Sequence, residues 1–301
     1  MFNRNRCAAA AALATASACC RAQAPPPAAQ QHWLPLPEWG NVHTRNVALI
    51  GTEAALIGLY GRAKWWKSGF TTDFRTVNEG WFGQNTYAGG ADKLGHFYMN
   101  YVTSRLATRL FAWNGNDPAH ALRLAALTTL GTMTAVEVLD GFSRRWRFSK
   151  EDATMNALGA GAAVLLEQHR ALDDIVDLRL HYRPSASNRH HFDPLGDYSG
   201  QAYVLALKAA GVPALRDQPR LRYFELSARY GARDYAETRR EINQRRHRNL
   251  YLGVSLNLVE LLGVARVGQN ASPAMCALTD GVFEYVQLPG VSVFGTETLD
   301  R

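Results

Sequence analysis

Apolar residues recur at helical spacing through four segments in the first half of the chain, with polar residues between them. The segments are residues 46–60, 93–113, 119–139 and 153–167. Residues 171–183 are expected to continue as a further helix. Because successive amphipathic helices bury their apolar faces against one another, this order predicts a helical bundle.

The pattern changes to alternation in the second half of the chain. Residues 221–230 and 249–258 alternate in side-chain character, as half-buried strands do. Two shorter segments, residues 283–286 and 291–294, are further expected strands. The predicted fold class is therefore mainly α, with a helical bundle of about four to five helices and a smaller C-terminal region that carries β-strands.

The composition of the N-terminus sets the expected domain organisation. Residues 1–24 are typical of a signal peptide, because two arginines precede an alanine-rich run at residues 7–18, and Ala22-Gln23-Ala24 resembles a cleavage site. Residues 25–40 are expected to form a low-complexity tether, residues 41–183 the helical bundle and residues 184–301 the β-rich region.

Cys19 follows small residues, as in a bacterial lipobox, but the leucine that is usual three positions before the cysteine is absent. A lipidated Cys19 and a plain signal peptide are both open, and both predict export to the periplasm, with an outer-membrane anchor in the first case.

The net charge of the chain indicates which classes of partner to expect. The 301 residues carry a formal net charge of +7, and three of the arginines lie in the leader, which leaves about +4 for the exported protein. A basic surface suits anionic lipids, so a membrane surface or an envelope lipid is the expected partner. The sequence holds no nucleic-acid-binding motif, and nucleic acid is not expected. Only Cys276 lies in the body of the chain, which excludes a disulfide framework.

Ionisable residues interrupt the apolar helical segments at helical spacing. Asp92 and His96 are four residues apart, and Glu137 and Asp140 are three apart, so each pair lies on one helix face. A buried carboxylate or imidazole is unfavourable unless it is paired, hydrogen-bonded or bound to a metal. We therefore expect these faces to meet in one shared polar centre.

Five further residues are expected at the same centre. Asp152 and Asn156 form a third pair at a spacing of four, and Lys93 is expected to join the centre from the second helical segment. Glu53 lies in the first helical segment, and Glu79 lies in the aromatic loop before the second. These residues complete a candidate ligand site or polar centre built from several helices.

Two kinds of chemistry fit such a centre. In a catalytic site, His96 would act as general base, oriented by Asp92, and Lys93 would stabilise an anion. Carboxylates and histidine at such intervals in bundle cores also bind metals. A divalent metal ion held there would have the ligands Asp92, His96, Glu137 and Asp152.

A structural explanation accounts for some of the same residues. Ser149 and Asp152 have the spacing of a capping box, and Gly141 after Asp140 is typical of the end of a helix. His96 and the nearby carboxylates could equally satisfy one another inside the bundle. The sequence thus predicts a polar centre and leaves open whether it is structural, ligand-binding or catalytic.

One helical segment tests whether the bundle crosses a membrane. Residues 119–139 are long enough to span a bilayer, but Arg123 and Glu137 lie near their ends, and Glu53 interrupts the first helical segment. These charges favour a soluble or peripheral bundle. An integral membrane bundle packed around the polar centre is the alternative.

The order of three motifs resembles a known family. They are Asp92-Lys93-Leu94-Gly95-His96-Phe97, Glu137-Val138-Leu139-Asp140-Gly141 and Asp152-Ala153-Thr154-Met155-Asn156. Over residues 65–161 the chain resembles the YfiM-like family of predicted periplasmic lipoproteins, a domain of unknown function (DUF2279), and more distantly VanZ-like proteins. The resemblance implies an envelope location, a helical bundle and a shared centre at these motifs, with no established activity.

Three hypotheses for the function follow. The first is an exported envelope protein without enzymatic activity, whose buried centre of Asp, Lys, His and Glu side chains is a structural core or a small-ligand pocket. The second is a metal-dependent hydrolase that acts on an envelope lipid or glycan. The third is a VanZ-like integral membrane protein.

Overall fold

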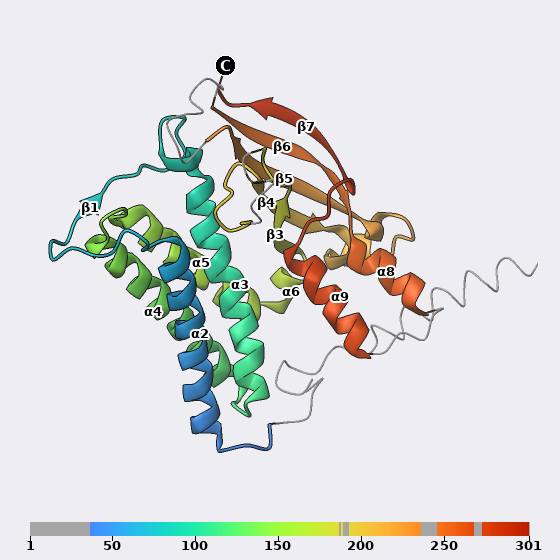
Figure 1. Cartoon of the computed structure of the whole chain (residues 1–301). Helices are drawn as coiled ribbons and strands as arrows, with labels where there is room; N and C mark the ends of the chain where they lie inside the picture. Colours follow the sequence, from blue (N-terminus) through green and yellow to red (C-terminus); the bar gives the residue numbers. More distant parts are fainter. Residues whose placement is uncertain (1–36, 187, 189–192, 236–245, 268–272, 301) are drawn as a thin grey trace, which may run out of the picture.

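The computed structural model describes residues 37–186, 188, 193–235, 246–267 and 273–300 (Figure 1). The expected signal peptide, Cys19 and most of the expected tether lie outside the described residues. Within the described chain, the long helices form one layer and a twisted sheet forms the next (Figure 1).

The four long helices are α2 (Val42–Lys64), α3 (Ala91–Trp113), α4 (Pro118–Phe142) and α5 (Lys150–Gln168). Three of them begin at a polar side chain that accepts a hydrogen bond from a backbone N–H of the first turn, namely Asn41, Asp117 and Ser149. α3 packs against α4 and α5, and α2 lies beside α4 (Figure 1). The four helices and the cap at Ser149 that the sequence predicted are present.

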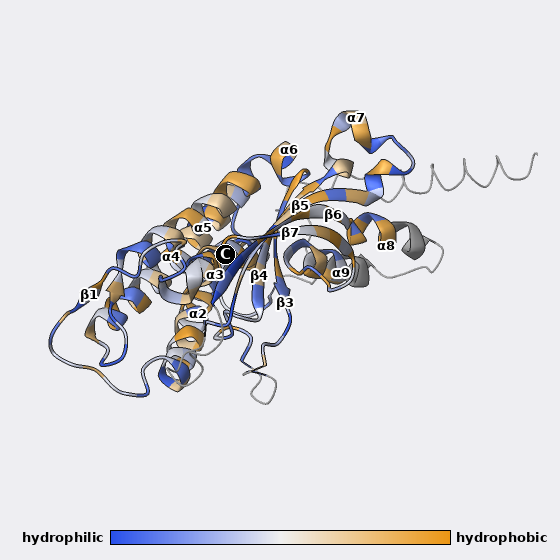
Figure 2. Ribbon diagram, turned by 90° about the horizontal axis from the view of Figure 1, so that it is seen from above, coloured by the Kyte–Doolittle hydropathy of each residue, from blue (hydrophilic) through white to orange (hydrophobic). Residues whose placement is uncertain are grey.

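The main sheet is antiparallel, with the strand order β3-β4-β5-β6-β7. Its strands are β3 (Val176–Tyr182), β4 (Gln201–Lys208), β5 (Phe224–Arg233), β6 (His247–Leu256) and β7 (Ser292–Thr298). The helix α3 lies on one side of this sheet, and α8 (Leu258–Val267) and α9 (Pro273–Tyr285) lie on the other (Figure 2). The short helices α6 (Arg170–Asp173) and α7 (Pro213–Arg216) connect α5 to β3 and β4 to β5.

The predicted fold class, a bundle of four to five helices with a minor strand region, is wrong. The protein has a mixed fold with a five-stranded antiparallel sheet, a parallel pair formed by β1 (Thr76–Val77) and β2 (Phe148–Ser149), and more helices than expected. Residues 171–183, expected as a helix, form α6 and β3. The expected strand at residues 283–286 belongs instead largely to α9.

The side chains of β3 explain why this segment is a strand. Val176, Leu178 and Leu180 alternate with polar residues, and this period of two places all three on one face of the sheet. That face packs against a core cluster from α3 and α5 that includes Tyr98 and Tyr101. Tyr285, the last residue of α9, joins this cluster at the edge strand β3, where the next residue, Val286, bridges to Leu180. A helix would have spread the same apolar side chains around its circumference.

The opposite face of the sheet carries buried polar side chains. Arg179 donates hydrogen bonds to Glu225 at 2.5 Å, to Asp177 at 2.5 Å and to Gln287 at 3.0 Å. Ser227 and Ser255 form a further contact of 2.7 Å. The buried charge of Arg179 is therefore satisfied by partners from β3, from β5 and from the segment after α9.

His181 on this polar face makes the stability of the sheet sensitive to acid. Burial lowers the pKa of His181 from 6.5, and the neighbouring Arg229, Arg233 and Arg183 lower it further, to about 4. Between these values the unfolded chain binds a proton that folded His181 does not, so stability falls as the pH falls through this window. We expect the urea midpoint of the wild type to drop more steeply from pH 6.5 to 4 than that of His181→Gln. The same substitution at exposed His120 should leave the slope unchanged, and parallel curves for wild type and His181→Gln would contradict the assignment.

Within the described residues, α4 is the one helix long and apolar enough to cross a membrane, with a mean hydropathy of 1.3 over its most apolar window. Core helices of soluble proteins meet the same criterion, but only 28% of this window is buried. Leu127, in the middle of α4, is 70% exposed. The choice between a peripheral and an integral helical unit therefore remains a prediction.

Candidate functional site

A left-handed turn before α3 places the first residues of the candidate site. Ala88, Gly89 and Gly90 have φ values of 47°, 60° and 85°. A Cβ atom on Gly90 would lie 2.5 Å from the ring of Phe82 and 2.8 Å from the carbonyl oxygen of Trp81, so only glycine fits there. α3 then begins directly, and Asp92 lies in its first turn, where the helix dipole favours a negative charge.

Lys93 is the central cation of the site. Its side chain is fully buried, and Nζ donates to Asp92 Oδ2 at 2.9 Å, to Asp152 Oδ1 at 2.6 Å and to Glu79 Oε2. The carboxylates come from the loop before α3, from α3 itself and from the first turn of α5. With all three carboxylates ionised, this group has a formal charge of −2.

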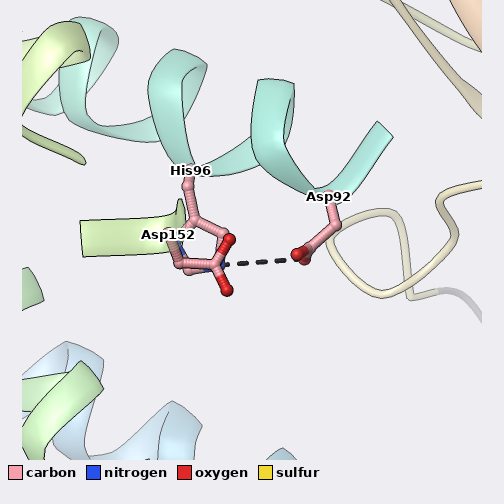
Figure 3. A group of neighbouring side chains, drawn as sticks. All are labelled: Asp92, His96 and Asp152. Carbon is pink, nitrogen blue, oxygen red and sulfur yellow. Dashed lines mark ion pairs between the residues drawn. The ribbon is translucent and has the colours of Figure 1, made fainter. Parts of the chain in front are cut away.

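His96 lies one helical turn beyond Asp92 and faces two of the same carboxylates (Figure 3). Its Nε2 is 3.7 Å from Asp92 Oδ1 and 3.9 Å from Asp152 Oδ1, and both distances are too long for a hydrogen bond. The other ring nitrogen, Nδ1, is 3.1 Å from Asn156 Oδ1. Because an amide oxygen can only accept, Nδ1 carries a proton in this contact, and Nε2 faces Asp92 and Asp152.

Burial and the neighbouring charges together shift the pKa values of these groups. Burial opposes ionisation of Asp92, but His96 and Lys93 hold its pKa below the ordinary value. Burial and the charge of Asp92 raise the pKa of Asp152. Burial raises the pKa of Glu79 to about 7, against the opposing effect of Lys93. Burial would lower the pKa of His96, but the surrounding carboxylates raise it to about 9. The carboxylates of the centre therefore stabilise a positive charge on His96.

Two further predicted residues, Glu137 and Asp140 of α4, lie on the other side of the imidazole. Glu137 Oε1 is 3.6 Å from His96 Nδ1, and burial raises the pKa of Glu137 to about 8. Asp140 accepts a hydrogen bond of 2.6 Å from the indole N–H of Trp66, and burial raises its pKa to about 6. Glu137 thus faces the nitrogen opposite to the one that faces Asp92 and Asp152.

Glu53 does not join this centre. Its carboxyl group lies beside Thr129 of α4, and burial raises its pKa. Thr129 precedes Glu137 by eight residues, which is about 12 Å along a helix axis. The first helix therefore contributes no ligand to the site, whereas the other predicted residues come together around Lys93 and His96.

Two residues of the site had no place in the sequence prediction. Asn100 donates to Asn156 Oδ1 at 2.6 Å and to the carbonyl oxygen of His96 at 2.9 Å. Its position four residues after His96 continues the polar stripe of α3, so the spacing could have identified it. The hydroxyl group of Tyr198 donates to Asp92 from the connection between β3 and β4. No local pattern links Tyr198 to α3.

Three of these side chains have the geometry of a metal site. Asp92, His96 and Asp152 each offer one ligand atom, and these atoms all lie within 4.8 Å of one another. An ion that binds a nitrogen and an oxygen at about 2.1 Å each keeps them roughly 3 to 4 Å apart, close to the distances at Nε2. Three of the four predicted metal ligands therefore lie close together, and the fourth, Glu137, lies outside this group.

Comparison with known proteins gives one match. Residues 78–168 match the family model of predicted periplasmic lipoproteins, DUF2279. These residues include all of α3, α4 and α5, and all of the polar centre except Tyr198. No curated protein and no solved structure matches the chain. The match confirms the predicted similarity to this family and is consistent with a location in the periplasm or cell envelope, while the VanZ-like resemblance stays a prediction.

Proposed function

We propose that this protein is an exported envelope protein that binds one divalent metal ion between Asp92, His96 and Asp152. The observation that supports this proposal best is the pair of distances of 3.7 and 3.9 Å at His96 Nε2. They are too long for hydrogen bonds and suit two atoms that bind the same ion.

Charge supports the same proposal. Lys93 neutralises only one of the three carboxylates around it, and a divalent ion would balance the remaining charge of −2. Protons take this role when no ion is bound, and the carboxylates accordingly raise the pKa of His96. Metal ions and protons are expected to compete for the centre.

The hydrogen bonds made by the proposed ligands are also compatible with a bound metal ion. In metal sites, the second nitrogen of a histidine ligand commonly donates to an oxygen that fixes the ring, as His96 Nδ1 can do to Asn156 Oδ1. Lys93 holds the second oxygen of Asp92, Oδ2, and leaves Oδ1 toward His96. At Asp152 the oxygen that faces His96, Oδ1, also accepts from Lys93, and it would bind the ion through its remaining lone pair. One imidazole and two carboxylates are ligands suited to Zn²⁺ or Mn²⁺.

A second candidate function is hydrolysis of an envelope lipid or glycan. The observation that favours it is the side chain of His96, which is 20% exposed while Asp92 and Asp152 are buried. Three protein ligands with an open side are the arrangement of catalytic rather than structural metal sites. A bound metal would supply a water molecule of lowered pKa, and Lys93 would stabilise negative charge beside it.

Metal content tests the proposal. We expect the purified full chain, dialysed against Zn²⁺ or Mn²⁺ and then freed of excess metal, to retain one ion per chain in elemental analysis. His96→Ala and Asp152→Asn should each reduce the retained metal by about 10-fold or more, because one of three ligands is lost. His120→Ala, at an exposed position of α4, should retain it fully.

Thermal unfolding of the same variants separates metal loss from misfolding. His96→Ala is expected to fold and to unfold cooperatively in chelator, at a lower melting temperature than the wild type because the carboxylates lose the protonated imidazole. Metal-free wild-type protein, or equal metal in wild type and His96→Ala, would contradict the proposal. Hydrolysis of bis-p-nitrophenyl phosphate or p-nitrophenyl butyrate by the metal-loaded wild type, lost in His96→Ala, would support the second candidate.

A further inference from the structure

An apolar cleft lies between α3 and the sheet, on the side of α3 that faces away from the polar centre. Leu94, Phe97 and Tyr98 line it from α3. The sheet contributes mainly apolar and aromatic side chains, from Leu178, Tyr203, Leu205, Ala228, Tyr230 and Leu250. The cavity has a volume of about 220 Å³. Since Asp92 and His96 lie on the other face of α3, the cleft is separate from the proposed metal site.

The apolar surface continues from the cleft along the sheet. Leu207, Leu226, Val254 and Val293 are direct neighbours in the register and form one row across four strands. Leu205 and Leu252 extend the next row toward the cleft. The exposed fractions are 63% for Leu226, 61% for Leu252 and 81% for Val293. Exposed apolar side chains that gather in this way mark a binding surface.

A basic segment borders the end of this surface. It runs from Lys208, at the end of β4, to Arg222, just before β5, and contains four basic residues and one acidic residue. Asp177 and Glu260 pair with Lys208 and Arg222. Arg216 and Arg220 are exposed. Arg216 donates to the carbonyl oxygens of Ala210 and Gly211, and the acidic group nearest to it, Asp174, is 4.0 Å away. Positive charge is therefore available beside the apolar rows.

We infer that this cleft and the adjoining strand face bind one acyl chain of an anionic phospholipid, with the phosphate group near Arg216 and Arg220. From Tyr203 in the cleft to Lys208 at the basic segment, β4 advances about 17 Å. An acyl chain spans about half of the roughly 30 Å hydrocarbon core of a bilayer, or about 15 Å. The apolar length and the position of the cations thus match one lipid chain and its headgroup. This inference goes beyond the proposed metal site and does not depend on it.

Native mass spectrometry of the full chain, incubated with phosphatidylglycerol in mild detergent, tests the inference. We expect one bound phospholipid per chain. Ala228→Trp fills the cleft and should reduce the bound fraction about 10-fold. Leu226→Glu should do the same by placing a charge in the apolar row. Leu56→Glu on α2 is the matched control, because Leu56 has the same exposed fraction of 63% as Leu226, and this variant should bind normally.

The charge requirement is tested with phosphatidylcholine, which has no net charge. Wild type should bind it at least about 5-fold less than phosphatidylglycerol, and the double variant Arg216→Glu, Arg220→Glu should abolish the difference. Circular dichroism of each variant confirms folding. The inference is overturned if Leu56→Glu and Leu226→Glu lose lipid equally, if Ala228→Trp binds as the wild type does, or if the surface instead forms a dimer that excludes lipid.

Discussion

Replacing Lys93 by methionine is expected to lower the free energy of unfolding by about 3–5 kcal/mol at neutral pH. Lys93 is fully buried and is the shared partner of Glu79, Asp92 and Asp152. Its removal leaves three carboxylates together without their cation, and methionine fills a similar volume. Urea denaturation followed by circular dichroism measures the loss. The loss should shrink as the pH falls, because the carboxylates then take up protons.

Lys64→Met provides the control for Lys93→Met. Lys64 pairs with Asp193 at 2.8 Å, but its side chain is 41% exposed. Surface ion pairs of this kind contribute less than about 1 kcal/mol. If Lys93→Met costs no more than Lys64→Met, the centre around Lys93 is not a coupled, buried charge network.

Gly159→Ala is expected to destabilise the protein by about 1–3 kcal/mol or more and to disturb the candidate site. Gly159 lies where α5 crosses α3, and a Cβ atom there would be 2.1 Å from the carbonyl oxygen of Phe97. This backbone atom cannot move without separating the two helices. Asp152 and Asn156 lie on α5 and His96 on α3, so the same separation lengthens the contacts of the centre.

Gly161→Ala, two residues further along α5, is the matched control. A Cβ atom at this position meets nothing within 4 Å. Alanine should then stabilise the helix by up to about 1 kcal/mol, because glycine is a poor helix former. Thermal unfolding of both variants measures the difference. Equal effects of the two substitutions would contradict the close packing of α3 on α5.

Much of the candidate site was accessible from the sequence because helical spacing fixes which side chains share a face. The intervals of Asp92–His96 and Asp152–Asn156 predicted their convergence, and the helices α3 and α5 bring them together. Glu53 was assigned to the polar centre only because it interrupts an apolar segment. Its carboxyl group lies beside Thr129, about 12 Å along α4 from Glu137. Tyr198 reaches Asp92 through a contact distant in sequence, which no local spacing records.

The sheet was the part of the fold that local pattern described least well. β5, β6 and β7 overlap the alternating segments that were predicted as strands. β3 follows α5 closely, and its leucines were attributed to a continued helix. In β4 the small buried residues Ala202, Val204 and Ala206 alternate with larger, less buried ones. The strand pairs on both edges, with β3 and β5, and this pairing between distant segments supports it more than local propensity does.

X-ray absorption spectroscopy of the Zn²⁺-loaded protein is the most direct test of the central claim, that Asp92, His96 and Asp152 bind one metal ion. The account predicts a first shell of nitrogen and oxygen atoms at about 2.0–2.1 Å, with the outer-shell scattering of one imidazole, and loss of that scattering in His96→Ala. A first shell without imidazole scattering, or with scattering unchanged in His96→Ala, would contradict it.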